Sequence, residues 1–585
     1  MSLRYRILPH PERSVFEVTL CFKALSDEPC LSLPNWVPGS YLVRDMAGDV
    51  IELSASTAKQ TLTVQKLQKS LWRLEGVHKN AIIEVSYEVF AADVSVRRAY
   101  LDTRRGFMTF SSLCLLPQGG DDELCEVEFC GQNTTDWCLF TTLAAVKVKE
   151  NGFGLYRAEN FQALIDTPVE MGKPEVISLT VCGTPHRVII SGERFDFDAK
   201  RLQKDLKKAL ATVIAFWEPE KKKAPFKSYD FYLNIGETIY GGLEHASSTA
   251  LAASFYDLPR KGEVELSSGY RKLLELMVHE YFHAWWVKRV KPAAFVPYDL
   301  RTESYTQLLW VFEGFTSYYA PLLLARSAVF SADNLLDSLN QALGTFHNRA
   351  CDSKQTLAES SFDAWIKYYK IRANRNNAVT SYYDKGAIAA MALDAHIREK
   401  SRGKKSLDDV LRLAWIECDK ARENYRGIGE NDMPSLFERA TALDITDEIN
   451  TWINKTGTPN LKSVAKALGL DVKTEPLPLS RRVLGISVRG ETTLFVREVE
   501  DSGAAQKAGL MVDDELVALN GYRIYAHNFE KVLAMLENEK ILTVHYFRQA
   551  RLHELAVKKT EIKERCLFKA KKHAKALSGW IGVRA

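Results

Sequence analysis

The residues best suited to do chemistry in this chain are His279, Glu280 and His283, which form an HExxH pattern. Residues 271–290 around them contain no proline or glycine, and their apolar side chains recur at helical spacing. On a helix the two histidines lie one turn apart on one face, so both imidazoles can bind Zn²⁺ while Glu280 reaches a metal-bound water as a base. The alternative is a core helix with two buried histidines, but chance HExxH patterns are rare in a chain with only 12 histidines.

A catalytic zinc site needs a third protein ligand and an open fourth position. Glu313 follows His283 by thirty positions, within the apolar segment 309–315. An unpaired carboxylate is costly among apolar side chains, and a metal ion would offset that cost. We therefore expect Glu313 to be the third ligand; the alternative is a buried ion pair with an arginine or a lysine.

A glycine-rich segment has residues that suit contacts with a substrate. Gly241, Gly242 and Glu244 follow an expected strand at 230–235. Glycines let a ligand approach the backbone closely, and an edge strand can hold a peptide by main-chain hydrogen bonds. Glu244 would then pair with a free ammonium group. The alternative is a glycine-rich turn with a surface glutamate.

Tyr382 and Tyr383 open a further expected helix at 383–400. A phenol directed at the metal would donate a hydrogen bond to a developing oxyanion. Read alone, such tyrosines are more often structural, so these residues by themselves leave both interpretations open.

The composition is that of an ordinary globular chain with several domains. The 585 residues are 46% hydrophobic and 26% charged, and the net charge of +4 gives no reason to expect nucleic-acid or membrane partners. No apolar run predicts a transmembrane helix, and the N-terminus has no apolar leader, so we expect a cytoplasmic protein. The ten cysteines form no CxxC pair. Free thiols fit a chain of this size better than disulfides around Cys114 to Cys138, and cysteine zinc sites are not expected.

The secondary-structure pattern changes twice along the chain. Residues 1 to about 175 contain short, alternating β runs between turn residues. From about 196 helices predominate, and we expect them at 197–217, 271–290, 303–326, 334–346, 383–400, 406–424 and 447–453. Residues 474–482 contain two prolines and have the pattern of a linker, after which β runs return.

The last part of the chain resembles a PDZ domain. Its β runs at 483–488 and 495–499 are followed by small residues at 502–505 and by an acidic-to-apolar segment that leads to Asn520-Gly521. The resemblance implies that Leu484, Gly485 and Ile486 form a carboxylate-binding loop, where a peptide C-terminus adds as an extra strand. The alternative is a PDZ domain that only packs on the rest of the chain.

The motifs GGLEH, HExxH, the distant Glu313 and YxKG occur in an order that resembles the gluzincin aminopeptidases related to aminopeptidase N. Residues 33–41 (LPNWVPGSY) and the PDZ pattern narrow this to a resemblance with the glycyl aminopeptidase family over nearly the whole chain. The family architecture is multidomain α+β. The resemblance implies an N-terminal β-sheet domain at 1–175, a thermolysin-like zinc catalytic domain at 176–400, a helical domain at 401–473, a C-terminal PDZ domain at 478–565 and a tail at 566–585.

The resemblance also implies a metal centre and a base. His279, His283 and Glu313 would hold one Zn²⁺ per chain. Glu280 would deprotonate the zinc-bound water and later return the proton to the leaving amine.

The remaining roles are implied in the same way. Tyr383 is the tyrosine of YxKG and would stabilise the oxyanion. Glu244 would bind the substrate amine, and Gly241 and Gly242 would line the substrate backbone. Trp286 stands where the family usually has asparagine, which concerns a contact behind the ligands and not the ligands themselves.

The function implied by the resemblance is a zinc-dependent aminopeptidase that hydrolyses the first peptide bond of peptides with small N-terminal residues such as Gly or Ala. Two alternatives remain at this point. One is an endopeptidase to which the PDZ domain delivers protein C-termini. The other is a PDZ-bearing binding protein whose metal site has no activity.

Overall fold

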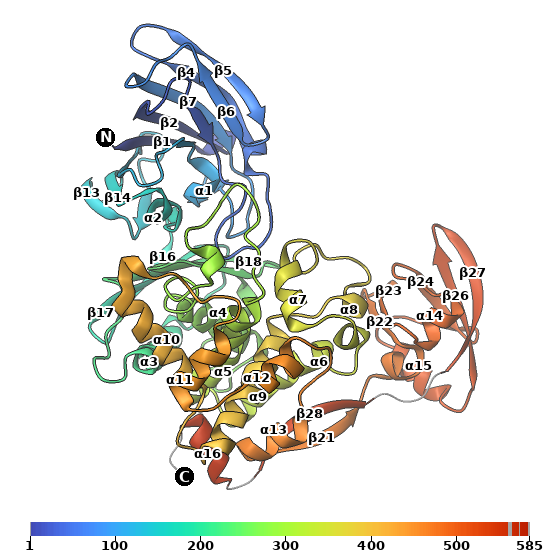
Figure 1. The fold of residues 1–585 in the computed structure, drawn as a ribbon. Helices are drawn as coiled ribbons and strands as arrows, with labels where there is room; N and C mark the ends of the chain where they lie inside the picture. Colours follow the sequence, from blue (N-terminus) through green and yellow to red (C-terminus); the bar gives the residue numbers. More distant parts are fainter. Residues whose placement is uncertain (1, 560–563, 572–573, 583–585) are drawn as a thin grey trace. The chain divides into compact units, whose positions relative to one another are not determined.

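The structure, a computed structural model, describes residues 2–559, 564–571 and 574–582 and contains helices and sheets in comparable measure (Figure 1). Contacts divide the chain into two compact units. The first comprises Met1–Tyr305, Ser327–Val329 and Ala414–Gly429, and the second comprises Thr306–Arg326, Phe330–Leu413 and Glu430–Ala585. The mixed α and β architecture predicted from the sequence is confirmed.

The N-terminal part of the first unit is built on a long sheet (Figure 1). Alternating buried and exposed side chains in its strands place one face on an apolar core. The strands lie in the order β10-β3-β6-β5-β4-β7-β2-β1-β11-β14-β13. Their bounds are β1 (Leu3–His10), β2 (Val15–Lys23), β3 (Cys30–Ser32), β4 (Val50–Ser56), β5 (Thr61–Gln68), β6 (Leu71–Glu75), β7 (Ile82–Phe90), β10 (Leu116–Pro117), β11 (Cys125–Phe129), β13 (Ala144–Val148) and β14 (Gly154–Ala158).

A smaller sheet and two short helices complete this part. The sheet has the order β12-β15-β9-β8. The bounds are β8 (Tyr100–Leu101), β9 (Arg105–Met108), β12 (Cys138–Thr141), β15 (Val169–Gly172), α1 (Phe110–Leu113) and α2 (Phe161–Ile165).

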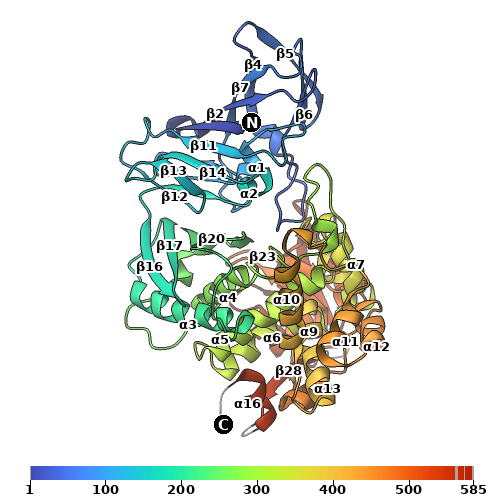
Figure 2. The same ribbon diagram turned by 60° about the vertical axis from the view of Figure 1, so that its left-hand side comes forward.

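A five-stranded sheet with two long helices beside it follows in the same unit (Figure 2). Its order is β16-β17-β18-β20-β19, so the short strand β19 forms one edge, antiparallel to β20. The bounds are β16 (Glu175–Val181), β17 (Thr184–Gly192), β18 (Tyr229–Gly236), β19 (Gly241–Glu244), β20 (Ser248–Ser254), α3 (Ala199–Trp217) and α4 (Ser268–Phe282). Helix α4, which begins at a Ser267 cap, packs against β19 and β20.

Helix α4 ends earlier than the sequence predicts. The expected helix runs to 290, whereas the observed one ends at Phe282 and is followed by turns. Val287 has a φ of 92°, a conformation that a β-branched residue rarely adopts and that cannot continue a helix. The segment contains no glycine or proline, so its sequence does not predict this bend.

The second unit is mainly helical before the segment that resembles a PDZ domain. The bounds are a π-helical turn η5 (Trp310–Gly314), α5 (Phe315–Arg326), α6 (Ala332–Phe346), α7 (Leu357–Phe362), α8 (Arg375–Ala378), α9 (Asp384–Lys400), α10 (Leu407–Ala421, whose last residues belong to the first unit), α11 (Met433–Thr441), α12 (Thr446–Glu448), a second π-helical turn η9 (Ile449–Ile453) and α13 (Leu461–Leu468). Helices α5 and α9 are almost wholly buried and pack on each other. The helix expected over 303–326 starts only at the π turn.

The segment that resembles a PDZ domain has its own apolar core and a sheet of order β22-β23-β24-β26-β27, with β25 paired to β24 (Figure 1). The bounds are η10 (Ser480–Leu484), β22 (Ile486–Arg489), β23 (Leu494–Val499), α14 (Ala504–Ala508), β24 (Glu515–Leu519), β25 (Tyr522–Arg523), α15 (Phe529–Met535), β26 (Ile541–Arg548) and β27 (Arg551–Lys558). Strand β22 forms one edge of this sheet.

The segments that flank the PDZ domain pair with each other. Strand β21 (Leu470–Pro476) is antiparallel to β28 (Glu564–Ala570), and helix α16 (Lys575–Ile581) follows with its Trp580 fully buried. The expected linker at 474–482 is thus part strand and part π-helical turn, and the segment expected as a tail contains a strand and a helix. Residues 560–563, 572–573 and 583–585 of the expected PDZ domain and tail lie outside the described residues.

All ten cysteines are free thiols. Across the described residues, no helix combines the length and the apolar character needed to cross a membrane.

Candidate active site

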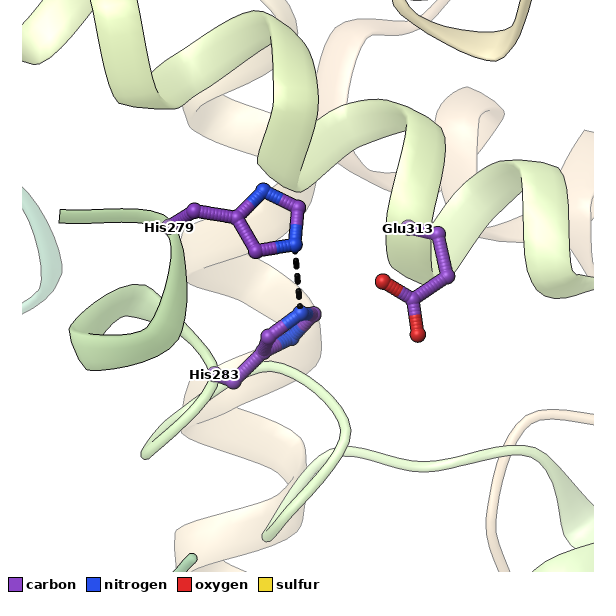
Figure 3. Close-up of side chains that lie close together, drawn as sticks. All are labelled: His279, His283 and Glu313. Atoms are coloured by element: carbon purple, nitrogen blue, oxygen red, sulfur yellow. Dashed lines mark hydrogen bonds between the residues drawn. The ribbon is translucent and has the colours of Figure 1, made fainter. Parts of the chain in front are cut away.

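The two histidines of the HExxH pattern face one point. His279 lies in the last turn of α4 and His283 is its C-terminal cap residue. Their Nε2 atoms are 3.1 Å apart (Figure 3). His283 is fully buried, whereas His279 is partly exposed, so the point that they share is reachable from one side.

The bend after α4 orients His283. Its Nδ1 lies 2.8 Å from the backbone carbonyl of Trp286, which accepts the Nδ1 proton and leaves Nε2 as the lone-pair donor. The Trp286 side chain points elsewhere and stacks on Trp217. Since the contact comes from the Trp286 backbone, it does not depend on the tryptophan side chain.

Glu313 completes a cluster with the two histidines. One ligand atom from each of the three residues lies within 4.8 Å of the other two (Figure 3). In a tetrahedral zinc site with bonds of about 2.0–2.1 Å, ligand atoms are about 3.3 Å apart, which the separation of the two nitrogens approaches. Two imidazole nitrogens and a carboxylate oxygen are a donor set that fits catalytic Zn²⁺.

A close crossing of two backbones positions Glu313. Glu313 is buried in the π turn η5, and π turns occur often at functional sites. A Cβ atom on the next residue, Gly314, would lie 2.6 Å from the Cα atom of Gly386 in α9. Only two glycines allow η5 and the start of α9 to approach this closely.

The general-base candidate Glu280 has a glycine opposite it. Glu280 is buried, and a Cβ on Gly242 of β19 would lie 2.0 Å from its Oε1. Because Gly242 has no side chain, the backbone of edge strand β19 lies directly against the Glu280 carboxylate. Burial raises the pKa of the nearby Tyr229 well above its usual value, and the charges of both Glu280 and Glu244 raise it further.

Glu244, at the end of β19, is buried beneath the N-terminal part of the first unit. Only 4% of its surface is exposed, and a Cβ on Gly39 would lie 2.4 Å from its Oε2. Gly39 has a φ of 94°, which favours glycine. The 33–41 segment thus covers the carboxylate with its backbone, and the fully buried rings of Trp36 and Tyr41 anchor that segment.

The Arg97 side chain occupies part of the surface beside β19. Arg97 donates from Nη2 to the Gly242 carbonyl at 3.2 Å, and a Cβ on Gly241 would lie 3.3 Å from its Nη1. The sequence gave no signal for Arg97, because it lies 145 positions from Gly242.

Tyr383 is the residue just before α9, and its hydroxyl lies 2.9 Å from that of Tyr369. The ring of Tyr368 is close to both Tyr382 and Tyr383. Tyr382 is fully buried, and burial raises its pKa, as do the charges of Tyr369 and Glu313. The tyrosines therefore form one cluster in the unit that holds Glu313.

Comparisons with known proteins agree with this geometry. Residues 4–173 match the Peptidase M61 N-terminal domain, residues 272–389 match the M61 glycyl aminopeptidase and residues 474–546 match the PDZ domain. A crystal structure of an aminopeptidase N family protein from Idiomarina loihiensis is similar with a TM-score of 0.94 and 31% identity, over 99% of this chain and 100% of that one. This chain belongs to the M61 glycyl aminopeptidase family.

The M61 chain is accordingly a zinc metallopeptidase of the aminopeptidase type, and the family resemblance predicted from its motifs is confirmed. A zinc metallopeptidase of the M1 class from Deinococcus radiodurans is a remote neighbour, with a TM-score of 0.47 and 12% identity over 79% of this chain and 95% of that one. No curated protein sequence matches the chain.

The M61 chain also has a buried network of charged and polar groups that was not predicted from the sequence. Lys288 forms an ion pair with Asp166 at 2.6 Å, and the same carboxylate accepts a hydrogen bond from the Ala246 amide at 3.0 Å. Burial favours a raised pKa for Asp166, but the Lys288 charge and the His245 hydrogen bond hold the pKa below its usual value. The network fixes the chain directly after Glu244.

In the PDZ domain the expected carboxylate-binding loop joins η10 to β22. Leu484 and Ile486 are buried, and Gly485 has a φ of 73°. The Gly485 amide donates to Arg481 O at 3.1 Å, and its carbonyl accepts from Glu500 N at 2.8 Å. Peptide binding by this loop stays a prediction.

Proposed function

We propose that this enzyme is a zinc aminopeptidase that removes one residue at a time from the N-terminus of peptides, with a preference for small residues such as Gly and Ala. The observation that carries the proposal is the pair of buried carboxylates, Glu244 on β19 and Glu280 on α4, which packs against β19. One carboxylate would bind the substrate ammonium group and the other would act on the adjacent peptide bond.

Glu244 supports the exopeptidase reading. A carboxylate accepts strong, charge-assisted hydrogen bonds from an ammonium group, and a free peptide N-terminus carries such a group. The Gly39 backbone lies directly against this carboxylate and would close the site beyond the first residue. That closure also favours small side chains, in agreement with the glycyl specificity in the family's description.

His279, His283 and Glu313 would hold the metal ion. When bound, Zn²⁺ supplies Lewis-acid chemistry: it polarises the first peptide carbonyl and lowers the pKa of water to about 7. Glu280 takes the proton of the attacking water on a carboxylate oxygen and returns it to the leaving nitrogen.

Three further residues would bind and stabilise the substrate. Gly241 and Gly242 present backbone to the peptide along the edge of the sheet. Tyr383 donates a hydrogen bond from its hydroxyl to the carbonyl oxygen as negative charge develops there.

The test uses a Gly-Ala-initiated peptide, free and N-acetylated, with products identified by mass spectrometry. We expect release of glycine from the free peptide only. In Glu244→Gln, kcat/KM for the free peptide should fall about 10- to 100-fold, the range for a lost hydrogen bond to a charged group. Glu237→Gln, an exposed glutamate just before β19, should leave it unchanged. Internal cleavage of the acetylated peptide would make the enzyme an endopeptidase and remove the role of Glu244.

A further inference from the structure

A cavity of about 1030 Å³ lies within the first unit, apart from the residues proposed for peptide cleavage. Its walls come from the loop between α3 and β18, from the bend after α4, and from the end of α10. Seven cationic side chains and three carboxylates line it, while Glu244, Glu280 and the two histidines do not. The cavity is therefore strongly positive in a chain whose overall net charge is only +4.

Three of the cations stand together at residues 288–291. Lys288 pairs with Asp166 at 2.6 Å. Among the described residues, Arg289 donates to the backbone carbonyls of Pro225, Ala246 and Ala284. In the part of the chain that the structure describes, neither Arg289 nor Lys291 forms an ion pair.

The positive charges of Lys288, Arg289 and Lys291 repel one another, and the environment of Lys291 shows this effect. Its ammonium group lies 4.8 Å from the centre of the Tyr298 ring. Burial lowers the pKa of Lys291 to about 8, and the neighbouring Lys288 and Arg289 charges act in the same direction. An added anion would relieve the repulsion among these groups.

Apolar and aromatic side chains line the rest of the cavity. Phe226, Trp415 and Tyr425 supply rings, and Lys223 and Lys227 stand exposed among the lining residues without ion pairs in the described chain. The volume far exceeds that of an inorganic phosphate ion. A ligand that fits the cationic side chains and the aromatic rings of the wall carries several negative charges attached to an aromatic ring system.

We propose that this cavity binds a small phosphorylated organic anion with an aromatic part, of the nucleoside polyphosphate class, at a site distinct from the metal centre. The phosphates would lie against Lys288, Arg289 and Lys291, with further contacts to Lys223 and Lys227. The aromatic body would stack on the rings of the wall.

Isothermal titration calorimetry of the full chain at low ionic strength tests this with ATP, inorganic tripolyphosphate and adenosine. We expect one ATP per chain, weaker binding of tripolyphosphate, no binding of adenosine, and a Kd that rises with added salt. Lys291→Met should weaken ATP binding about tenfold, while Lys291→Arg should largely retain it. Lys227→Met, on an exposed side chain, should weaken binding without affecting the fold.

Two controls locate the site. Lys59→Met changes an exposed lysine in the turn between β4 and β5 and should leave ATP affinity unchanged. Glu313→Gln should also leave it unchanged, because the site does not involve the metal ligands. The proposal is overturned if ATP does not bind at about 1 mM, if Lys291→Met and Lys227→Met bind it normally, or if Glu313→Gln abolishes binding.

Discussion

Glu280 is buried within the last turn of α4, beside the histidines that it serves. Glu280→Gln keeps the size and removes the basic oxygen, so turnover should fall by at least about 10³-fold while zinc content, measured by mass spectrometry of the metal, stays at one per chain. Glu263→Gln, in the exposed loop before α4, is the matched control. Turnover retained in Glu280→Gln would rule out its role as the base.

The tyrosine cluster permits a graded test. Tyr383→Phe should lower kcat by about 10²–10³-fold, as expected for the loss of an oxyanion donor. Tyr369→Phe removes only the hydroxyl 2.9 Å from that of Tyr383 and should lower kcat by about five- to tenfold. Both are measured with the free Gly-Ala peptide. A large loss in Tyr382→Phe with normal Tyr383→Phe activity would move the role to Tyr382.

At the scale of elements, the crossing of η5 and α9 fixes the third ligand. Gly314→Ala places a methyl group 2.6 Å from Gly386 Cα, so the backbones must separate and Glu313 must shift. Zinc affinity, measured by competition with a chelator, should fall at least about tenfold. Gly344→Ala in α6 meets nothing within 4 Å and should stabilise the protein by up to about 1 kcal/mol. Unchanged zinc affinity in Gly314→Ala would refute the role of this crossing.

The elements also show what the sequence could predict. Helical spacing predicted α4, the HExxH motif lies within five consecutive residues, and a run of β segments and turn residues resembled a PDZ domain, so each of these signals is local. The bend after Phe282 depends on the positive φ of Val287, which no local pattern announces. Strand β21 forms because β28 pairs with it, and β28 lies far along the chain. The same holds for Gly39 and Arg97, which reach β19 only after folding.

At the scale of the whole molecule, the buried His186 couples stability to pH. Its Nε2 lies 2.9 Å from the hydroxyl of Tyr281 in α4, and burial lowers its pKa from 6.5 to about 4. Between these values the unfolded chain binds a proton that the folded chain does not, so stability falls as pH drops from 6.5 towards 4. The loss amounts to about 3 kcal/mol.

Urea unfolding at pH values between about 5 and 7.5 measures this effect. His186→Gln should be less stable than the wild type near neutral pH, because a buried hydrogen-bonded ring is lost, but its stability should decline less on acidification. The exposed His78→Gln is the control and should follow the wild type. Acid effects at Asp166 fall below this range, because its pKa is lowered from 3.8. Equal slopes in wild type and His186→Gln would exclude His186 as the source.

Strands β21 and β28 have a consequence for the history and the engineering of the chain. Pro476 and Glu564 are partners at the end of their antiparallel ladder, so the polypeptide leaves the helical body and re-enters it at one place. A gene lacking the codons between them would need only a short hairpin turn to restore continuity. The pairing therefore predicts that the PDZ segment can be replaced by a short turn while strands β21 and β28 keep their register.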